Sequence, residues 1–330
     1  MKVSLKNIIV PSIPLAVLSV LFCFILWMSA FVGERITSIP SQSSFLVQVM
    51  QSLFSPNTLV SYLLSFSFNL LNAYLLAQLN NKFTLIRTRT FLPILIFLLL
   101  TGTWNDTHIV NGSHVALTLF ILSLFYFFEM YRNKKGAEQS FMGSLLLSIA
   151  SLLINPLLFL IPVFWIGFIM FQSFSMRTLL ASIFGAITPW IFYLSAYYIF
   201  QPSFNFQTLI TSNLIVGINI ATFSLPKLIY FPLLVIIMII NLVGMYSYAH
   251  GDVIHTRIKL NFFVFLLISI LVITSIFNLQ IASFLPIIAL VYSILVSHSF
   301  TLKQNNFYGY VFIVFFVINI LFTISKYLVF

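Results

Sequence analysis

The chain has 330 residues, of which 61% are hydrophobic and only 6% are charged, and its mean hydropathy is +1.11. Soluble domains carry about 25% charged residues, so this composition excludes a soluble enzyme. Successive apolar stretches of about 20 residues are typical of membrane-spanning helices, whereas outer-membrane barrels show shorter alternating segments. The sequence therefore predicts an all-α, polytopic transmembrane helical bundle, in which residues 1–330 form a single membrane domain.

About eleven apolar segments follow one another, and at about 20 residues each they leave no room for a soluble domain. The predicted spans are 8–33, 58–79, 91–103, 115–130, 141–154, 157–171, 179–200, 228–248, 260–277, 281–296 and 308–324. The first is too long for a signal-peptide core, so we expect it to be retained. Spans 91–103, 141–154 and 157–171 are short for a bilayer, and Asn155 with Pro156 predicts a tight hairpin between the last two.

The basic residues predict an orientation for these spans. Cytoplasmic loops are enriched in Lys and Arg, and an inside N-terminus places twelve of the 15 Lys and Arg residues on the inner side and leaves only Arg35, Lys227 and Lys326 outside. The inner set is Lys2, Lys6, Lys82, Arg87, Arg89, Arg132, Lys134, Lys135, Arg177, Arg257, Lys259 and Lys303. We therefore expect the C-terminus to lie on the outer side. The membrane itself is expected to be a bacterial cytoplasmic (inner) membrane. The basic residues form no continuous stripe, which argues against nucleic-acid binding.

Five carboxylates are present, and three of them, Glu129, Glu138 and Asp252, fall on the predicted inner side. The simplest interpretation is that each pairs in solvent with loop cations such as Arg132, Lys135 or Arg257. Asp252 lies in HGDVIH, whose two histidines are possible metal ligands, but no cysteine or second acid completes a metal site. A solvated loop is therefore the favoured interpretation of this motif, and no metal site is predicted.

The two outer carboxylates, Glu34 and Asp106, lie in the first and second outer loops, and Asp106 is followed by His108 and His114. If these loops pack together, two carboxylates and two imidazoles share one pocket, which suits general-base or metal-assisted chemistry. The alternative is that Glu34 pairs with Arg35 and that Asp106 caps the helix that begins near residue 113.

Two outer segments carry amphipathic patterns at helical spacing. Residues 44–55 place Ser and Gln on one face and apolar side chains on the other, which predicts a helix lying flat in the outer interface. The loop 201–227 shows similar spacing and ends at Lys227, which is a candidate to receive a lipid phosphate. The alternative for Lys227 is a snorkelling anchor at the start of a span.

Polar residues inside the spans favour helix packing over transport. Asn69 and Asn72 share one helix face, which favours an interhelical hydrogen bond, and we expect Asn241 and Asn319 in later spans to face other helices as well. Gly185, with Ala181, reads as a close-packing position. No ionisable residue is predicted near the membrane midplane, which argues against an ion-coupled transporter.

This layout resembles the GT-C superfamily of polytopic membrane glycosyltransferases. The resemblance covers about residues 2–200 and is carried by Glu34 just after the first span, by the 44–55 segment, and by FLPILIFLLL and the following helices with their basic inner loop. It departs from the family pattern in its first-loop acid, which is usually Asp, and in lacking a doubled-acid motif. The chain also resembles small bacterial integral-membrane proteins to which no activity is attached.

The resemblance implies transfer of a sugar from a polyprenyl-phosphate donor to an acceptor at the outer face. It implies catalytic roles for Glu34, as general base, and Asp106. Arg35, His108, His114 and Lys227 are the predicted substrate-binding residues. The alternatives are a non-catalytic membrane subunit or assembly factor, and a transporter or lipid flippase.

Overall fold

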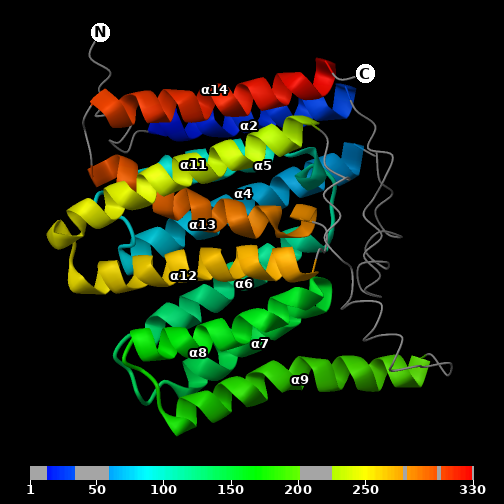
Figure 1. The fold of residues 1–330 in the computed structure, drawn as a ribbon. Coiled ribbons are helices and arrows are strands. Elements are labelled where there is room, and N and C mark those ends of the chain that lie inside the picture. The colour runs from blue at the N-terminus through cyan, green and yellow to red at the C-terminus, as the bar shows by residue number, and fades with distance from the viewer. Residues whose placement is uncertain (1–12, 34–58, 201–224, 278–280, 303–305, 329–330) are drawn as a thin grey trace.

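The computed structural model of the protein describes residues 13–33, 59–200, 225–277, 281–302 and 306–328 (Figure 1). All regular structure in these ranges is helical, which confirms the predicted fold class in its coarse form. The α-helices are α2 (Ile13–Gly33), α4 (Leu59–Phe83), α5 (Leu92–Thr103), α6 (Gly112–Glu129), α7 (Ala137–Leu153), α8 (Ile161–Met170), α9 (Met176–Phe200), α11 (Leu225–Tyr248), α12 (Ile254–Phe277), α13 (Ile281–Leu302) and α14 (Asn306–Leu328). Short 3₁₀ turns are η1 (Asn105–Thr107), η2 (Asn155–Leu160) and η4 (Ala249–Gly251).

Apolar helices occupy the positions of the predicted spans. Within the described ranges, seven are long and apolar enough to cross a membrane. Four shorter apolar helical segments complete the set, at Ala16–Met28, Leu92–Thr103, Ala137–Leu153 and Asn155–Met170. The last three correspond to the spans that the sequence marked as short. The helices fit a multi-pass membrane protein, whereas the number that fully cross stays a prediction.

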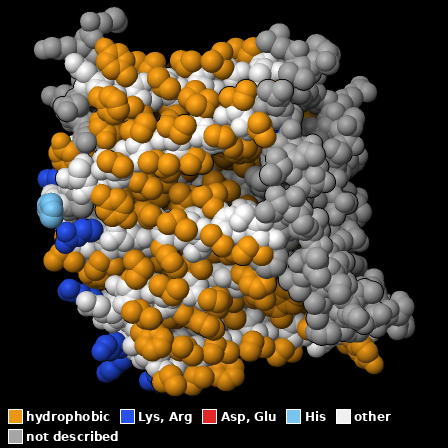
Figure 2. Space-filling model, in the orientation of Figure 1, with side chains coloured by type: hydrophobic (Ala, Val, Ile, Leu, Met, Phe, Trp, Pro, Cys, Tyr) orange, Lys and Arg blue, Asp and Glu red, His pale blue; other side chains and the backbone are white. Residues whose placement is uncertain are grey.

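The bundle is apolar outside as well as inside. Figure 2 shows hydrophobic side chains spread over the visible face of the helices. α13 forms the centre of the bundle, because 89% of its most apolar 18-residue stretch is buried. Only 17% of the corresponding stretch of α9 is buried. α9 is therefore an edge helix, and most of its surface is available to lipid.

Lys and Arg side chains gather at one end of the bundle, at the left of Figure 2. We call this end the basic end and define it by residues 82–90, 130–136, 171–178 and 249–259. The opposite end, called the far end, comprises the end of α2, residues 104–111 and the start of α11. The separation follows the predicted alternation of loops, although the orientation itself stays a prediction.

The buried asparagines of α4 pair with neighbouring helices. Asn69 Nδ2 donates to Thr101 Oγ1 of α5 at 2.9 Å, and Asn72 Oδ1 accepts from Thr118 Oγ1 of α6 at 2.8 Å. In α14, Asn319 Oδ1 accepts from the Tyr230 hydroxyl of α11 at 2.7 Å. These contacts confirm the interhelical hydrogen bonds predicted for Asn69 and Asn72. Asn241 is buried, but its Nδ2 donates within its own helix, to the Ile237 carbonyl at 2.8 Å.

The segment containing Pro156 reverses the chain, as predicted, although it does so through η2 and not through a two-residue turn. The Arg132 N–H, before α7, donates to the Phe171 carbonyl, after α8, at 2.9 Å. The α7–α8 pair therefore returns to the basic end. α9 then runs parallel to α7, and Ser148 Oγ of α7 donates to the Ala186 carbonyl of α9 at 2.6 Å.

Candidate functional site

The site predicted from the sequence is only partly visible. Glu34, Arg35 and the 44–55 segment lie outside the described residues. Asp106 belongs to η1, but the position of its side chain is not among the described features. The convergence of Glu34 with Asp106 therefore stays a prediction. The structure does describe the backbone around Asp106 and the two histidines, His108 and His114.

The turn that carries Asp106 is held by its own polar side chains. Thr107 Oγ1 donates to the backbone carbonyls of Thr101 and Trp104, and the His108 N–H donates to the Asn105 carbonyl at 2.9 Å. Asn111 caps α6, because its Oδ1 accepts from the Ser113 N–H at 3.0 Å. The alternative interpretation, in which Asp106 is the cap, is therefore wrong.

His108 connects this turn to the first two helices. Its side chain is 1% exposed, its Nε2 lies 3.0 Å from the Gly102 carbonyl oxygen, and its ring centroid lies 4.1 Å from that of Trp27. Ser65 of α4 donates to the His108 carbonyl and accepts from Trp27 Nε1 at 3.0 Å. The last turns of α2 are thereby fixed against the Asp106 turn.

His114 is also buried, at 3% exposure, in the first turn of α6. Its Nε2 lies 2.9 Å from the Thr107 carbonyl oxygen, so Nε2 carries the proton and donates it there. Its Nδ1 is then free to accept from the Asn111 N–H at 3.4 Å, which completes a capping box. Both imidazoles thus hold the fold of the turn, and phosphate binding by them stays a prediction.

Lys227 lies half-buried in the first turn of α11, at the far end. One turn further along, the Phe231 ring centroid lies 6.5 Å from that of Trp104, just before η1. The start of α11 therefore adjoins the Asp106 turn, which in turn adjoins the end of α2. Three elements that carry or precede the predicted site residues meet at this end.

A second polar site, which the sequence interpretation missed, lies at the basic end. Asp252 is 8% exposed and its Oδ2 lies 3.0 Å from Nε2 of His298, which is fully buried in α13. Asp252 Oδ1 and His298 Nδ1 are buried without a hydrogen-bond partner among the described residues. The prediction of a solvated loop for Asp252 is wrong, because the loop before α12 turns its carboxylate into the bundle.

The available signal for this pair was an ionisable residue at the inner end of an apolar segment. His298 lies two residues beyond the predicted span 281–296, in the same helix α13, and an ionisable residue at such a position usually has a partner in the bundle. The other inner carboxylates behave more nearly as expected. Glu129 pairs with Lys82, although not with the predicted Arg132 or Lys135, and Glu138 is exposed.

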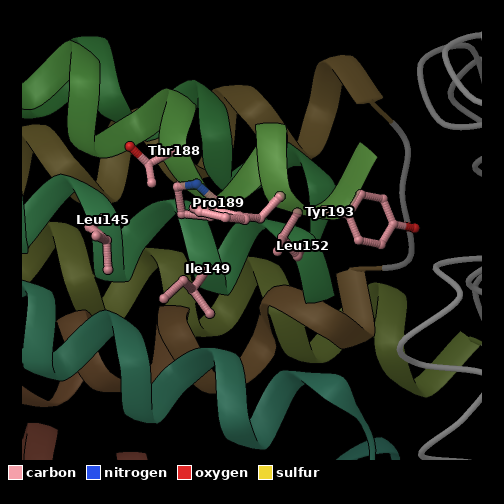
Figure 3. A pocket seen from close by; sticks show the side chains of 7 residues that line it. Leu145, Ile149, Leu152, Thr188, Pro189 and Tyr193 are labelled. Atoms are coloured by element: carbon pink, nitrogen blue, oxygen red, sulfur yellow. The ribbon is translucent and has the colours of Figure 1, made fainter. Parts of the chain in front are cut away.

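A shallow groove of about 500 Å³ lies between α7 and α9. Leu145 and Ile149 face Thr188 and Pro189 across it, as Figure 3 shows. Thr188 uses its hydroxyl within its own helix, on the Phe184 carbonyl at 2.6 Å. The groove is lined mainly by apolar side chains, with the hydroxyl-bearing Thr188 and Tyr193 as its polar residues, and is thus suited to a hydrocarbon chain.

No family model, no curated protein and no solved structure matches this chain. Within the described part of the chain, no group of three or more His, Cys, Asp or Glu residues is placed to hold a metal ion. The candidate site therefore rests on the geometry at the far end.

Proposed function

We propose that this multi-pass membrane protein transfers a sugar from a polyprenyl-phosphate donor at its far end, in the manner of GT-C glycosyltransferases. In this proposal the basic end faces the cytoplasm of a bacterium and the far end faces outward. The proposal follows from the layout of the chain and from how the elements at the far end are joined.

The observation that carries the proposal is the contact between Trp27 and His108. Because the two rings are 4.1 Å apart, the end of α2 adjoins the turn that contains Asp106. In the sequence Glu34 follows α2 directly, and the six residues from Trp27 to Gly33 at the end of α2 extend about 9 Å along the helix axis. In this proposal the two outer acids therefore lie near each other, as a shared site requires.

The proposed chemistry divides the residues by charge. Glu34 accepts the proton of the acceptor hydroxyl, since a carboxylate partly withdrawn from water is an effective general base. Asp106 orients the acceptor or assists this transfer. Lys227 and Arg35 bind the donor phosphate, because cations paired with phosphate form strong charge-assisted contacts. His108 and His114 act as positioning residues for the turn.

Replacing Glu34 by Gln tests the proposal, because Gln keeps the size and hydrogen bonding of Glu but cannot act as the base. We expect sugar transfer in proteoliposomes supplied with an undecaprenyl-phosphate-linked sugar to fall by about 10²- to 10⁴-fold. Glu138→Gln is the matched control, since Glu138 is an exposed carboxylate at the basic end, and it should retain full activity. Equal activity of the two variants would exclude Glu34 as the base.

A non-catalytic membrane subunit is the second candidate, and the buried histidines favour it. His108 and His114 direct ring nitrogens to the backbone carbonyls of Gly102 and Thr107, respectively, which is sufficient for a purely structural role. If the wild-type protein shows no transfer and instead purifies with a stoichiometric membrane partner, this second function replaces the first.

A further inference from the structure

Two loops at the basic end form one fixed surface, which we call the loop platform and define as residues 130–136 and 171–178. Besides the bond from Arg132 to Phe171, Ser175 Oγ donates to the Lys134 carbonyl at 3.2 Å. Each loop also contains a residue with left-handed backbone, Arg132 at φ 58° and Gln172 at φ 57°. Such conformations are unfavourable for side-chain-bearing residues and persist where the surroundings enforce them.

The platform carries an excess of positive charge. Arg132, Lys134, Lys135 and Arg177 are all exposed, and none of them forms an ion pair within the described part of the chain. Of the two acids that flank the platform in the sequence, Glu129 pairs with Lys82, and Glu138 is exposed in the first turn of α7. Four cations against one acid leave a net charge of about +3 on a small surface, which favours an anionic ligand over a zwitterionic one.

The backbone adds to this preference. α7 and α9 both begin at the platform, and helix N-termini attract anions through unpaired N–H groups and the helix dipole. α9 is capped by Ser175, whose Oγ accepts from the Thr178 N–H at 3.2 Å. α7 has no side-chain cap at Gly136. Although the Ala137 N–H donates to the Lys135 carbonyl at 2.8 Å, the positive end of the α7 dipole lies next to the lysines that precede the helix.

Apolar side chains border the cations. Phe174 is 41% exposed, Met176 is 73% exposed and Leu180 is 49% exposed, all beside Arg177 at the start of the edge helix. Cations next to apolar side chains at a helix end are typical of the level of lipid headgroups. A water-soluble phosphate compound would use the cations and leave these apolar groups unused.

We propose that the loop platform binds an anionic phospholipid of the basic-end leaflet. The headgroup phosphate contacts Lys134, Lys135 and Arg177, and the lipid chains lie against Met176 and Leu180. Glu138 opposes the headgroup and weakens the binding. The site anchors the α7–α9 edge of the bundle and is separate from the proposed transfer site at the far end.

Binding of phosphatidylglycerol and phosphatidylcholine to the full chain tests the proposal, with native mass spectrometry of the protein in neutral-detergent micelles. Lys134→Gln/Arg177→Gln should weaken phosphatidylglycerol binding about 10- to 30-fold, since a surface Lys or Arg contributes about fivefold or less each. Arg87→Gln/Arg89→Gln is the matched control, because it removes two exposed cations from the same end, and it should change binding less than about twofold.

Further measurements distinguish a specific anionic-lipid site from non-specific attraction and from a site for a soluble ligand. Glu138→Gln should strengthen phosphatidylglycerol binding, because it removes the opposing charge. Equal weakening by the two double variants would reduce the site to non-specific attraction, and equal binding of both lipids would exclude an anionic lipid site. Full competition by millimolar inorganic phosphate would point to a soluble phosphate ligand instead. Thermal unfolding of each variant checks that the fold is retained.

Discussion

Gly185→Ala is expected to destabilise the protein by about 3 kcal/mol, because α7 and α9 approach too closely at this position to admit a side chain. A Cβ added at Gly185 would overlap Ser144 Oγ and the carbonyl oxygen of Phe141. The carbonyl belongs to the α7 backbone and cannot rotate away, so the two helices would have to separate. Thermal unfolding in detergent, followed by tryptophan fluorescence, should show a clear fall in the midpoint.

Gly143→Ala is the control for this substitution. Gly143 is also a packed glycine of α7, but a Cβ there would meet its nearest atom, the Ser123 carbonyl oxygen, at 3.5 Å, which is an ordinary contact. Ala is also the better helix former by about 1 kcal/mol, so Gly143→Ala should be neutral or slightly stabilising. If both variants unfold at the same temperature, the close approach of α7 and α9 is not as described.

Asp252→Ala is expected to lower the free energy of unfolding by about 3 kcal/mol, because it leaves the buried His298 ring without its partner. His298→Ala should have a similar effect. The double variant should cost clearly less than the sum of the two, since the orphaned polar group is then gone. Chemical denaturation of the four proteins in detergent gives the coupling between the two residues directly.

Glu138→Ala supplies the comparison, because Glu138 is an exposed acid at the same end and its loss should change stability by less than about 0.5 kcal/mol. If Asp252→Ala lowers the free energy of unfolding as little as Glu138→Ala does, the carboxylate of Asp252 is solvated, as the sequence alone suggested.

The apolar helices were predictable because the length of an apolar segment depends only on local composition. The short segments 91–103, 141–154 and 157–171 match α5, α7 and the η2–α8 segment within a few residues, and Gly185 was identified as a close-packing position from its place in an apolar span. Asn69 and Asn72 were also predictable, since a buried amide in a span needs a partner.

The contacts of the polar residues at the two ends of the bundle were less predictable, because their partners are distant in the sequence or their burial depends on tertiary packing. Asp252 pairs with a residue 46 positions away, and nothing in HGDVIH indicates which helix its loop covers. His108 and His114 lie in a polar stretch that looks exposed, yet Trp27 and Ser65 draw the turn into the bundle. The capping role of Asn111 was missed, although Asn is among the best N-cap residues.

The most direct test of the far-end site is a cross-link between Glu34→Cys and Asp106→Cys. The lone native cysteine, Cys23, is buried and can be replaced by Ala to give a clean background. A short, membrane-impermeant bifunctional maleimide added to intact cells should join the two introduced cysteines. The control pair, Glu34→Cys with Glu138→Cys, should give no cross-link, because residue 138 lies at the basic end. Efficient cross-linking of 34 to 106 from outside is the predicted result; cross-linking no better than in the control, or labelling only after the membrane is opened, would contradict a shared outward-facing site.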